Sequence, residues 1–136
     1  MGLIYLDSCI LIYALEDAST RGDAVRSRLA RTEHTLAISP LVMLECLVGP
    51  IRSADLALRD RYQGAIERCD HINLGVPEYE RAAELRARHG LKTPDALHLA
   101  AAQLGGCTQL WTNDGRLAAA SKGLAVDVVA GDWVVE

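Results

Sequence analysis

Aromatic residues make up only 4% of this 136-residue chain, which contains no phenylalanine. It therefore offers no evident aromatic surface on which nucleic-acid bases could stack. Its most apolar segments, such as Cys9 to Leu15 and Ala96 to Leu104, are far shorter than the roughly 18 to 20 residues that span a membrane. No basic stretch precedes an apolar run at the start of the chain, as it would in a signal peptide. We therefore expect a cytoplasmic protein.

The four cysteines show no spacing that is typical of a metal site or a redox motif. Cys9, Cys46, Cys69 and Cys107 lie far apart, without a CxxC pair, and each has apolar neighbours. In a reducing cytoplasm such thiols rarely form disulfides. We expect all four to be core residues.

Several kinds of site that act on phosphate are also missing. No glycine-rich loop of the GxGxxG or GxxxxGK type is present, which argues against a nucleotide-binding module. Asp7-Ser8-Cys9 lacks the second acid that phosphoaspartate enzymes use after their first strand. A ribonuclease that works without metal would need paired histidines, but the histidines of this chain fall in separate predicted elements.

The charge balance is acidic, with 18 Asp and Glu against 14 Lys and Arg and a formal charge of -4. A nucleic-acid partner usually requires a basic excess. If four carboxylates form one metal site, however, the remainder of the chain is neutral. Its arginines are clustered, and we expect most of them to lie on solvated helix faces. The clusters are Arg21, Arg26, Arg28 and Arg31; Arg52, Arg59, Arg61 and Arg68; and Arg81, Arg86 and Arg88.

Short apolar segments alternate with helical periodicity along the chain, without a repeat or a linker. This order predicts one α/β domain, residues 1–136, with a central parallel sheet covered by helices on both faces. The predicted strands are Leu3 to Leu6, Thr35 to Ile38, His71 to Leu74, Gln109 to Thr112 and Val126 to Val129. The predicted helices run from about Ser8 to Leu15, Asp23 to Thr32, Pro40 to Val48, Ala54 to Cys69, Pro77 to His89, Pro94 to Leu104 and Asp114 to Ala120.

Capping residues mark several of these helix boundaries. Ser39 and Thr93 each precede a proline, an arrangement typical of an N-cap followed by the first helical residue. Gly49 and Pro50 are typical of a helix end. Asn113 is predicted to cap the last helix.

Four carboxylates, Asp7, Glu45, Asp95 and Asp114, interrupt or end apolar segments. Burying an unpaired carboxylate costs on the order of several kcal/mol, and no Lys or Arg lies within a helical turn of Asp7 or Glu45. Asp7 and Asp114 follow predicted strands, and ligands of open α/β sheets bind beyond the carboxyl ends of the strands. Glu45 and Asp95 share helix faces with apolar residues that should face inward. We therefore expect the four acids to meet at one site.

Carboxylate oxygens without Cys or His ligands suit a hard divalent cation, and Mg²⁺, with Mn²⁺ as a substitute, is the natural candidate. Such an ion can lower the pKa of a bound water and neutralise charge on a transferred phosphoryl group, so phosphodiester hydrolysis fits best. A structural cation is an alternative, but structural Ca²⁺ sites usually add clustered Asp, Asn and Gly loops that this chain lacks. Asp95, in the first turn of its helix, could also serve only the helix dipole.

The same residues carry a resemblance to a known family. The motifs are Leu3-Ile4-Tyr5-Leu6-Asp7-Ser8, Ser39-Pro40 followed by Glu45 and Gly49, Thr93-Pro94-Asp95-Ala96-Leu97-His98-Leu99-Ala100, and Thr112-Asn113-Asp114. In this order and context the chain resembles PIN-domain ribonucleases and, among them, the VapC toxins of type II toxin-antitoxin systems. The resemblance implies a three-layer α/β/α sandwich and a metal-dependent endoribonuclease whose acidic quartet is Asp7, Glu45, Asp95 and Asp114.

The resemblance also implies partners and a mechanism. The quartet would bind Mg²⁺ or Mn²⁺ and direct water onto an RNA phosphodiester, and a cognate VapB-type antitoxin would hold the toxin inactive. A homodimer is expected as well. Apolar helix residues that could serve these contacts, if they do not simply fill the core, are Ile10, Leu11, Ala14, Leu15, Leu56 and Leu58.

Other residues near the quartet are expected to support it or depart from the family. Ser8 and Thr112 are expected to orient the carboxylates, unless they act only as helix-cap and strand-end residues. His98 could be a ligand, but its place between Leu97 and Leu99 favours packing. Cys9 stands where many relatives have Asn. Many relatives also have an additional acid or an aromatic shortly after the final Asp, whereas Gly115, Arg116 and Leu117 follow Asp114 here. The alternative from another class is a noncatalytic PIN-like module that binds RNA or protein without cutting.

Overall fold

A parallel five-stranded sheet, with the strand order β3-β2-β1-β4-β5, forms the centre of the computed structural model, which describes residues 2–130. All four strand pairings are parallel. The strands are β1 (Leu3–Leu6), β2 (Thr35–Ile38), β3 (Asp70–His71), β4 (Gln109–Thr112) and β5 (Ala125–Asp127).

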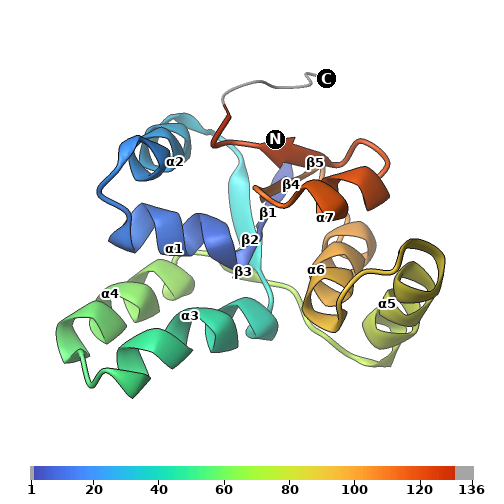
Figure 1. Cartoon of the computed structure of the whole chain (residues 1–136), viewed down its shortest axis with the longest axis horizontal. Coiled ribbons are helices and arrows are strands. Elements are labelled where there is room, and N and C mark those ends of the chain that lie inside the picture. Colours follow the sequence, from blue (N-terminus) through green and yellow to red (C-terminus); the bar gives the residue numbers. More distant parts are fainter. Residues whose placement is uncertain (1, 131–136) are drawn as a thin grey trace.

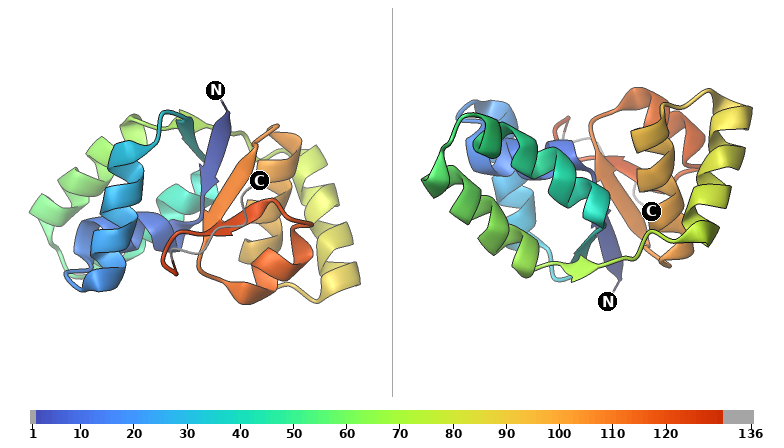
Figure 2. Two further views of the ribbon diagram at one scale, coloured as in Figure 1. Left: turned by 90° about the horizontal axis from the view of Figure 1, so that it is seen from above. Right: turned by 90° about the horizontal axis from the view of Figure 1, so that it is seen from below.

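The helices cover both faces of this sheet. Figure 1 shows α1 to α4 on one side and α5 to α7 on the other, and the views in Figure 2 agree. The helices are α1 (Ser8–Glu16), α2 (Thr20–Arg31), α3 (Pro40–Arg52), α4 (Leu56–Glu67), α5 (Val76–His89), α6 (Thr93–Leu104) and α7 (Gly115–Ala120). The predicted α/β/α sandwich is therefore confirmed. None of the helices between residues 2 and 130 is long and apolar enough to cross a membrane.

The central strands β1 and β4 fix where the functional residues lie. Strands of a parallel sheet are covered on both faces and therefore read as continuous apolar runs; Ile4, Tyr5 and Leu110 are fully buried. Leu6 pairs with Trp111, and the backbone N–H of Asp7 donates to the Trp111 carbonyl at 3.0 Å. The carboxyl ends of β1 and β4 consequently lie side by side.

Two predicted boundaries are wrong because tertiary contacts override local sequence. Helix α3 continues through Gly49 and Pro50 to Arg52. Proline lacks an N–H but its φ suits a helix, and Pro50 is buried, which offsets the lost hydrogen bond. Strand β3 has only two residues because its partner β2 ends at Ile38, just before the helix that Pro40 begins.

Smaller differences occur at other ends. Helix α2 begins at Thr20, because the Ser19 hydroxyl caps it by accepting from the Arg21 N–H at 3.3 Å. Thr93 is the first residue of α6 rather than its cap, and Lys92 occupies the capping position. Strand β5 ends at Asp127, and it forms the edge of the sheet next to β4.

Two of the clustered arginines hold helix α1, and Arg61 does so while remaining exposed, as predicted for most of them. The Arg26 guanidinium donates to the carbonyls of Tyr13, Ala14 and Asp17 at 3.3, 3.1 and 2.8 Å. Arg61 donates to the Leu15 carbonyl at 2.8 Å. These bonds satisfy carbonyls that a helix end leaves without partners. Helix α1 is therefore anchored at its C-terminus, and the segment at its N-terminus, which carries Asp7, is positioned by both the helix and the sheet.

Candidate active site

Three of the four predicted acids meet in one cavity at the carboxyl ends of β1 and β4. Asp7, Asp95 and Asp114 line a cavity of about 510 Å³. Asp7 lies between β1 and α1, Asp95 lies in the first turn of α6, and Asp114 caps α7. The cavity is completed by Ser8, Cys9, Tyr13, Asn113 and Gly115.

Asp7 is the most buried of these carboxylates, with 7% of its surface exposed. The Thr112 hydroxyl donates to Asp7 Oδ2 at 2.7 Å and accepts from the backbone N–H of Asp114 at 3.1 Å. Thr112 therefore fixes one carboxylate and links it to the loop that carries another. Ser8 lies farther away, with its Oγ 3.5 Å from Asp7 Oδ1.

Asp114, and not the predicted Asn113, caps α7. Its Oδ1 accepts from the backbone N–H groups of Arg116 and Leu117 at 2.9 and 3.2 Å. Within residues 2–130, its Oδ2 accepts no hydrogen bond. The cap therefore holds the carboxylate in place while one oxygen remains available to a ligand.

The electrostatics of Asp95 indicate that the cavity needs a cation. Partial burial raises the pKa of Asp95, and the neighbouring charges of Asp114, Asp7 and Glu45 raise it further, while His98 opposes them. Burial and like charges both disfavour the ionised carboxylate. A divalent cation among these oxygens would remove the repulsion, so the residues fit a hard metal ion.

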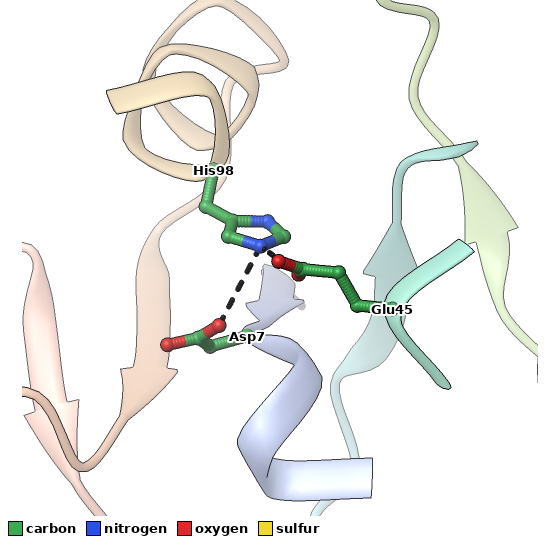
Figure 3. Close-up of side chains that lie close together, drawn as sticks. All are labelled: Asp7, Glu45 and His98. Carbon is green, nitrogen blue, oxygen red and sulfur yellow. Dashed lines mark hydrogen bonds and ion pairs between the residues drawn. The ribbon is translucent and has the colours of Figure 1, made fainter. Parts of the chain in front are cut away.

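Glu45 does not line this cavity but reaches Asp7 through a histidine. Figure 3 shows the His98 ring between the two carboxylates. His98 Nε2 lies 2.7 Å from Glu45 Oε1 and 3.6 Å from Asp7 Oδ1. Partial burial raises the pKa of Glu45, but the hydrogen bond and charge of His98, together with a hydrogen bond from Ser8, lower it by more, and the net pKa falls below the ordinary value.

Two hydroxyl groups hold His98 from its other side. His98 Nδ1 lies 2.7 Å from the Tyr5 hydroxyl, which lies 2.8 Å from the Ser39 hydroxyl. Because Nε2 faces two carboxylates, it carries a proton, and the Tyr5 hydroxyl donates to Nδ1 when the ring is neutral. Burial raises the pKa of Tyr5, which keeps it a neutral donor. Ser39 is the N-cap residue of α3, as predicted, but its hydroxyl makes no capping hydrogen bond and belongs to this chain of hydrogen bonds.

The hydrogen bonds of His98 lead to a prediction about stability. Replacing His98 by Leu should lower the free energy of unfolding of the metal-free protein by about 1–3 kcal/mol, because Tyr5 and Glu45 lose a partner in a buried setting. Replacing it by Gln, whose amide can donate to Glu45, should recover part of the loss. Urea unfolding of both variants measures this difference. Equal stability of the Leu variant and the wild type would show that His98 only fills space.

Two sets of residues could therefore hold a metal ion. The first is the oxygen set Asp7, Asp95 and Asp114, which line one cavity although their ligand atoms do not all lie within 4.8 Å of one another. In the second, Asp7, Glu45 and His98 each offer an atom within 4.8 Å of the others. The sequence predicted packing for His98; it is buried and packs against Tyr5, but it also bonds to Glu45.

The cysteines are free thiols, and the prediction that all four are core residues holds fully for only two of them. Cys46 and Cys107 are buried, whereas Cys9 is half-buried and lines the cavity. Burial and the nearby Asp7 raise the pKa of Cys9 to about 12. A hard divalent cation prefers oxygen to sulfur ligands, so Cys9 is poorly suited as a ligand for one.

Comparison with known proteins identifies the family. The PIN domain family model matches residues 4–123, and the chain therefore belongs to the PIN domain family. A comparison with curated proteins found no match.

Solved structures share the fold over nearly the whole chain. A toxin-antitoxin complex from Klebsiella pneumoniae contains a chain with 27% identity and a TM-score of 0.76, covering 92% of this chain and 97% of the other. VapBC2 from Rickettsia felis, bound to a promoter DNA fragment, gives 19% identity and a TM-score of 0.71. The match covers 90% of this chain and 96% of the other. VapC20 from Mycobacterium tuberculosis, described as a sarcin-ricin loop cleaving toxin, gives 17% identity and a TM-score of 0.74. The match covers 86% of this chain and 94% of the other.

Proposed function

We propose that the protein is a single-domain cytoplasmic endoribonuclease that depends on Mg²⁺, or on Mn²⁺ as a substitute, and serves as the toxin of a toxin-antitoxin pair. The observation that carries this proposal is the meeting of Asp7, Asp95 and Asp114 in one cavity of a PIN-domain chain, with Glu45 beside it. The similarity to the chain in the Klebsiella pneumoniae complex supports the toxin role.

In the proposed mechanism, the protein positions its carboxylates before RNA arrives. Thr112 holds Asp7, and the backbone of α7 holds Asp114. When bound, Mg²⁺ or Mn²⁺ would supply a polarised phosphate oxygen, a more acidic water and neutralisation of the charge that develops on the phosphate.

Glu45 has one of two roles in this proposal. It either completes the set of ligands or accepts a proton from the attacking water, and its hydrogen bond to His98 fixes the carboxylate for either role. In-line displacement by water then leaves a 5′-phosphate and a 3′-hydroxyl. The 2′-hydroxyl of the RNA is not the nucleophile.

The alternative, a noncatalytic PIN-like binding module, predicts a different result. Incubation of the purified protein with total RNA and Mn²⁺ should yield discrete fragments, which a gel resolves. RNA that is bound but stays intact under these conditions would favour the binding module. Sequencing the RNA ends after induced expression in cells would then identify whether tRNA, ribosomal RNA or messenger RNA is cut.

We also propose a cognate VapB-type antitoxin whose basic side chain, an Arg, reaches the carboxylates. An arginine can bind a carboxylate through two parallel hydrogen bonds, and the repulsion around Asp95 favours a cation there. Such a contact would compete with the metal, and the loss of affinity must be mutual.

The predicted result is that the complex, obtained by co-expression and co-purification, binds Mn²⁺ more weakly than the free protein. Calorimetric titration of both samples measures the difference. Full inhibition with unchanged Mn²⁺ affinity would mean that the antitoxin blocks RNA access elsewhere.

The surface that we propose for a homodimer differs in part from the residues expected from sequence. Ile10 and Leu11 are core residues, with exposures of 0% and 4%, so the sequence-based expectation that they serve partner contacts is wrong. Leu56 of α4, which was among the expected residues, is 70% exposed, and Leu44 and Ile51 of α3 are also 60% and 51% exposed. Exposed apolar groups of this kind mark interaction sites. Light scattering of the purified protein tests whether two copies associate.

A further inference from the structure

The arginine clusters of the sequence do not supply the positive charge beside the candidate active site. Arg26 and Arg61 bind carbonyls at the end of α1. Arg21 and Arg81 each form an ion pair with an acid three or four residues away along the chain. Arg28 lies 6.0 Å from the centre of the Trp111 ring, in a separate cavity. None of the clustered arginines lines either cavity that contains Asp95 and Asp114.

Two other cations do lie next to these carboxylates. Lys92 and Arg116 line a second cavity, of about 610 Å³, together with Asp95 and Asp114. These two acids and Gly115 also line the first cavity, so the two cavities adjoin. Lys92 and Arg116 are the only Lys or Arg residues that line either of them in the part of the chain that the structure describes.

Both cationic side chains are available to a ligand. Lys92 and Arg116 are exposed. Among residues 2–130, neither side chain forms an ion pair or donates a hydrogen bond. A long basic side chain beside acids usually pairs with them, and these two do not. A Cβ added at Gly115, which lines both cavities, would meet no atom within 4 Å, so the space beside this residue is open.

The charge around the cavities makes such cations necessary for an RNA substrate. The four carboxylates repel the phosphates of a nucleic acid. One divalent cation would offset half of their formal charge, and Lys92 and Arg116 carry enough charge to offset the other half. Contacts with phosphate from Lys and Arg supply most of the affinity for RNA that does not depend on sequence.

We propose that Lys92 and Arg116 form a subsite for a phosphate of the RNA strand next to the phosphate that is cut. The guanidinium of Arg116 can bind two phosphate oxygens at once, and the ammonium of Lys92 acts as a point charge. The two cavities share Asp95, Asp114 and Gly115, so one RNA strand can run from the first cavity into the second. This inference rests on the proposed function, because it takes RNA as the substrate.

The first test measures RNA binding without cleavage. In EDTA, the fluorescence anisotropy of a labelled single-stranded RNA should show that Lys92→Ala with Arg116→Ala weakens binding by about 10-fold or more. The slope of log affinity against log salt should fall in magnitude by about 1.4, because each lost contact with a single strand removes roughly 0.7. Arg68→Ala is the matched control: this exposed residue at the end of α4 lines neither cavity. An effect of the control equal to that of the pair would overturn the subsite.

The second test locates the phosphate. A short RNA cut by the wild type at one mapped position is prepared with a neutral methylphosphonate at each neighbouring linkage in turn. At one linkage, the substitution should lower kcat/KM of the wild type by about 10-fold. It should have no effect on the double variant, which has already lost the contact. Equal losses in both proteins at every linkage would overturn the proposal, as would the absence of any sensitive linkage in the wild type.

The two tests separate this inference from the proposed function. A wild type that binds RNA with the predicted salt dependence but does not cut it would overturn the endoribonuclease and retain the subsite. A wild type that cuts RNA, with a double variant that cuts and binds equally well, would retain the endoribonuclease and overturn the subsite. The variant Lys92→Arg with Arg116→Lys keeps both charges and should keep most of the affinity.

Discussion

Asp95→Asn is expected to lower kcat for RNA cleavage by on the order of 10²-fold or more, while the metal-free protein becomes more stable. Activity falls because one ionised ligand is replaced by a neutral amide of the same shape. Stability rises because partial burial, and then repulsion by Asp114, Asp7 and Glu45, disfavour the ionised Asp95, as its raised pKa indicates. Loss of activity together with a gain in stability distinguishes a functional carboxylate from one that supports the fold.

The gain in stability should depend on pH in a defined direction. The folded-state pKa of Asp95 is raised, so the folded protein binds the proton more tightly than the unfolded chain. The free energy of unfolding of the wild type therefore falls as the pH rises through the ordinary Asp range to the raised pKa. The amide that replaces this carboxylate in the variant does not titrate. The stability difference between variant and wild type should thus be absent in acid, and the variant should become the more stable as the pH rises towards neutral. Thermal unfolding in EDTA across this pH range measures the difference.

Asp7→Asn provides the comparison. It should also lower kcat by on the order of 10²-fold, but with less gain in stability, because an amide nitrogen near the His98 N–H would place two donors together and Thr112 would lose a charged acceptor. Retained activity in both variants would contradict the assignment of Asp7 and Asp95 as catalytic carboxylates. If Asp95→Asn lowers activity without raising stability, only the repulsion argument is contradicted, and the catalytic role of Asp95 is retained.

Removal of divalent cations is expected to abolish cleavage completely. The first candidate ligand set consists of carboxylates, and His98, which belongs to the second set, already bonds to Glu45 and the Tyr5 hydroxyl. The site therefore lacks the free pair of proton donor and acceptor that metal-free RNA cleavage needs. Dialysis against EDTA, followed by an assay on RNA, measures the loss.

Added Mg²⁺ or Mn²⁺ should restore the activity of the same sample, and this recovery is the control against irreversible unfolding. Circular dichroism before and after dialysis checks that the fold persists without metal. Undiminished cleavage in EDTA would contradict the assignment of the carboxylates to a metal site.

Much of the fold could be predicted because local sequence and tertiary structure agree. The apolar runs Leu3–Leu6 and Gln109–Thr112 are strands that the sheet buries on both faces, and their boundaries match the prediction. The errors fall where distant contacts decide. Burial keeps Pro50 inside α3, and the length of β2 limits β3 to two residues. Neither influence can be read from the residues of the segment itself.

The candidate site was predictable in part for a similar reason. Asp7 and Asp114 follow strands, so sheet topology places them together, and Asp95 joins them in one cavity. The position of Glu45 behind His98 was not foreseen, because it depends on side-chain packing between α3 and α6. Lys92 and Arg116 also gave no signal, since each is a single cation outside the arginine clusters. Only the adjoining cavities show what these two residues have in common.

The chemistry of the RNA ends tests the central proposal most directly. A short RNA of defined sequence, cut by the purified protein in Mg²⁺, would be resolved by mass spectrometry. Direct attack by water predicts that one fragment carries a 5′-phosphate and the other a 3′-hydroxyl. Fragments that end in a 2′,3′-cyclic phosphate and a 5′-hydroxyl would show that the 2′-hydroxyl is the nucleophile, and would contradict the proposed role of the carboxylates.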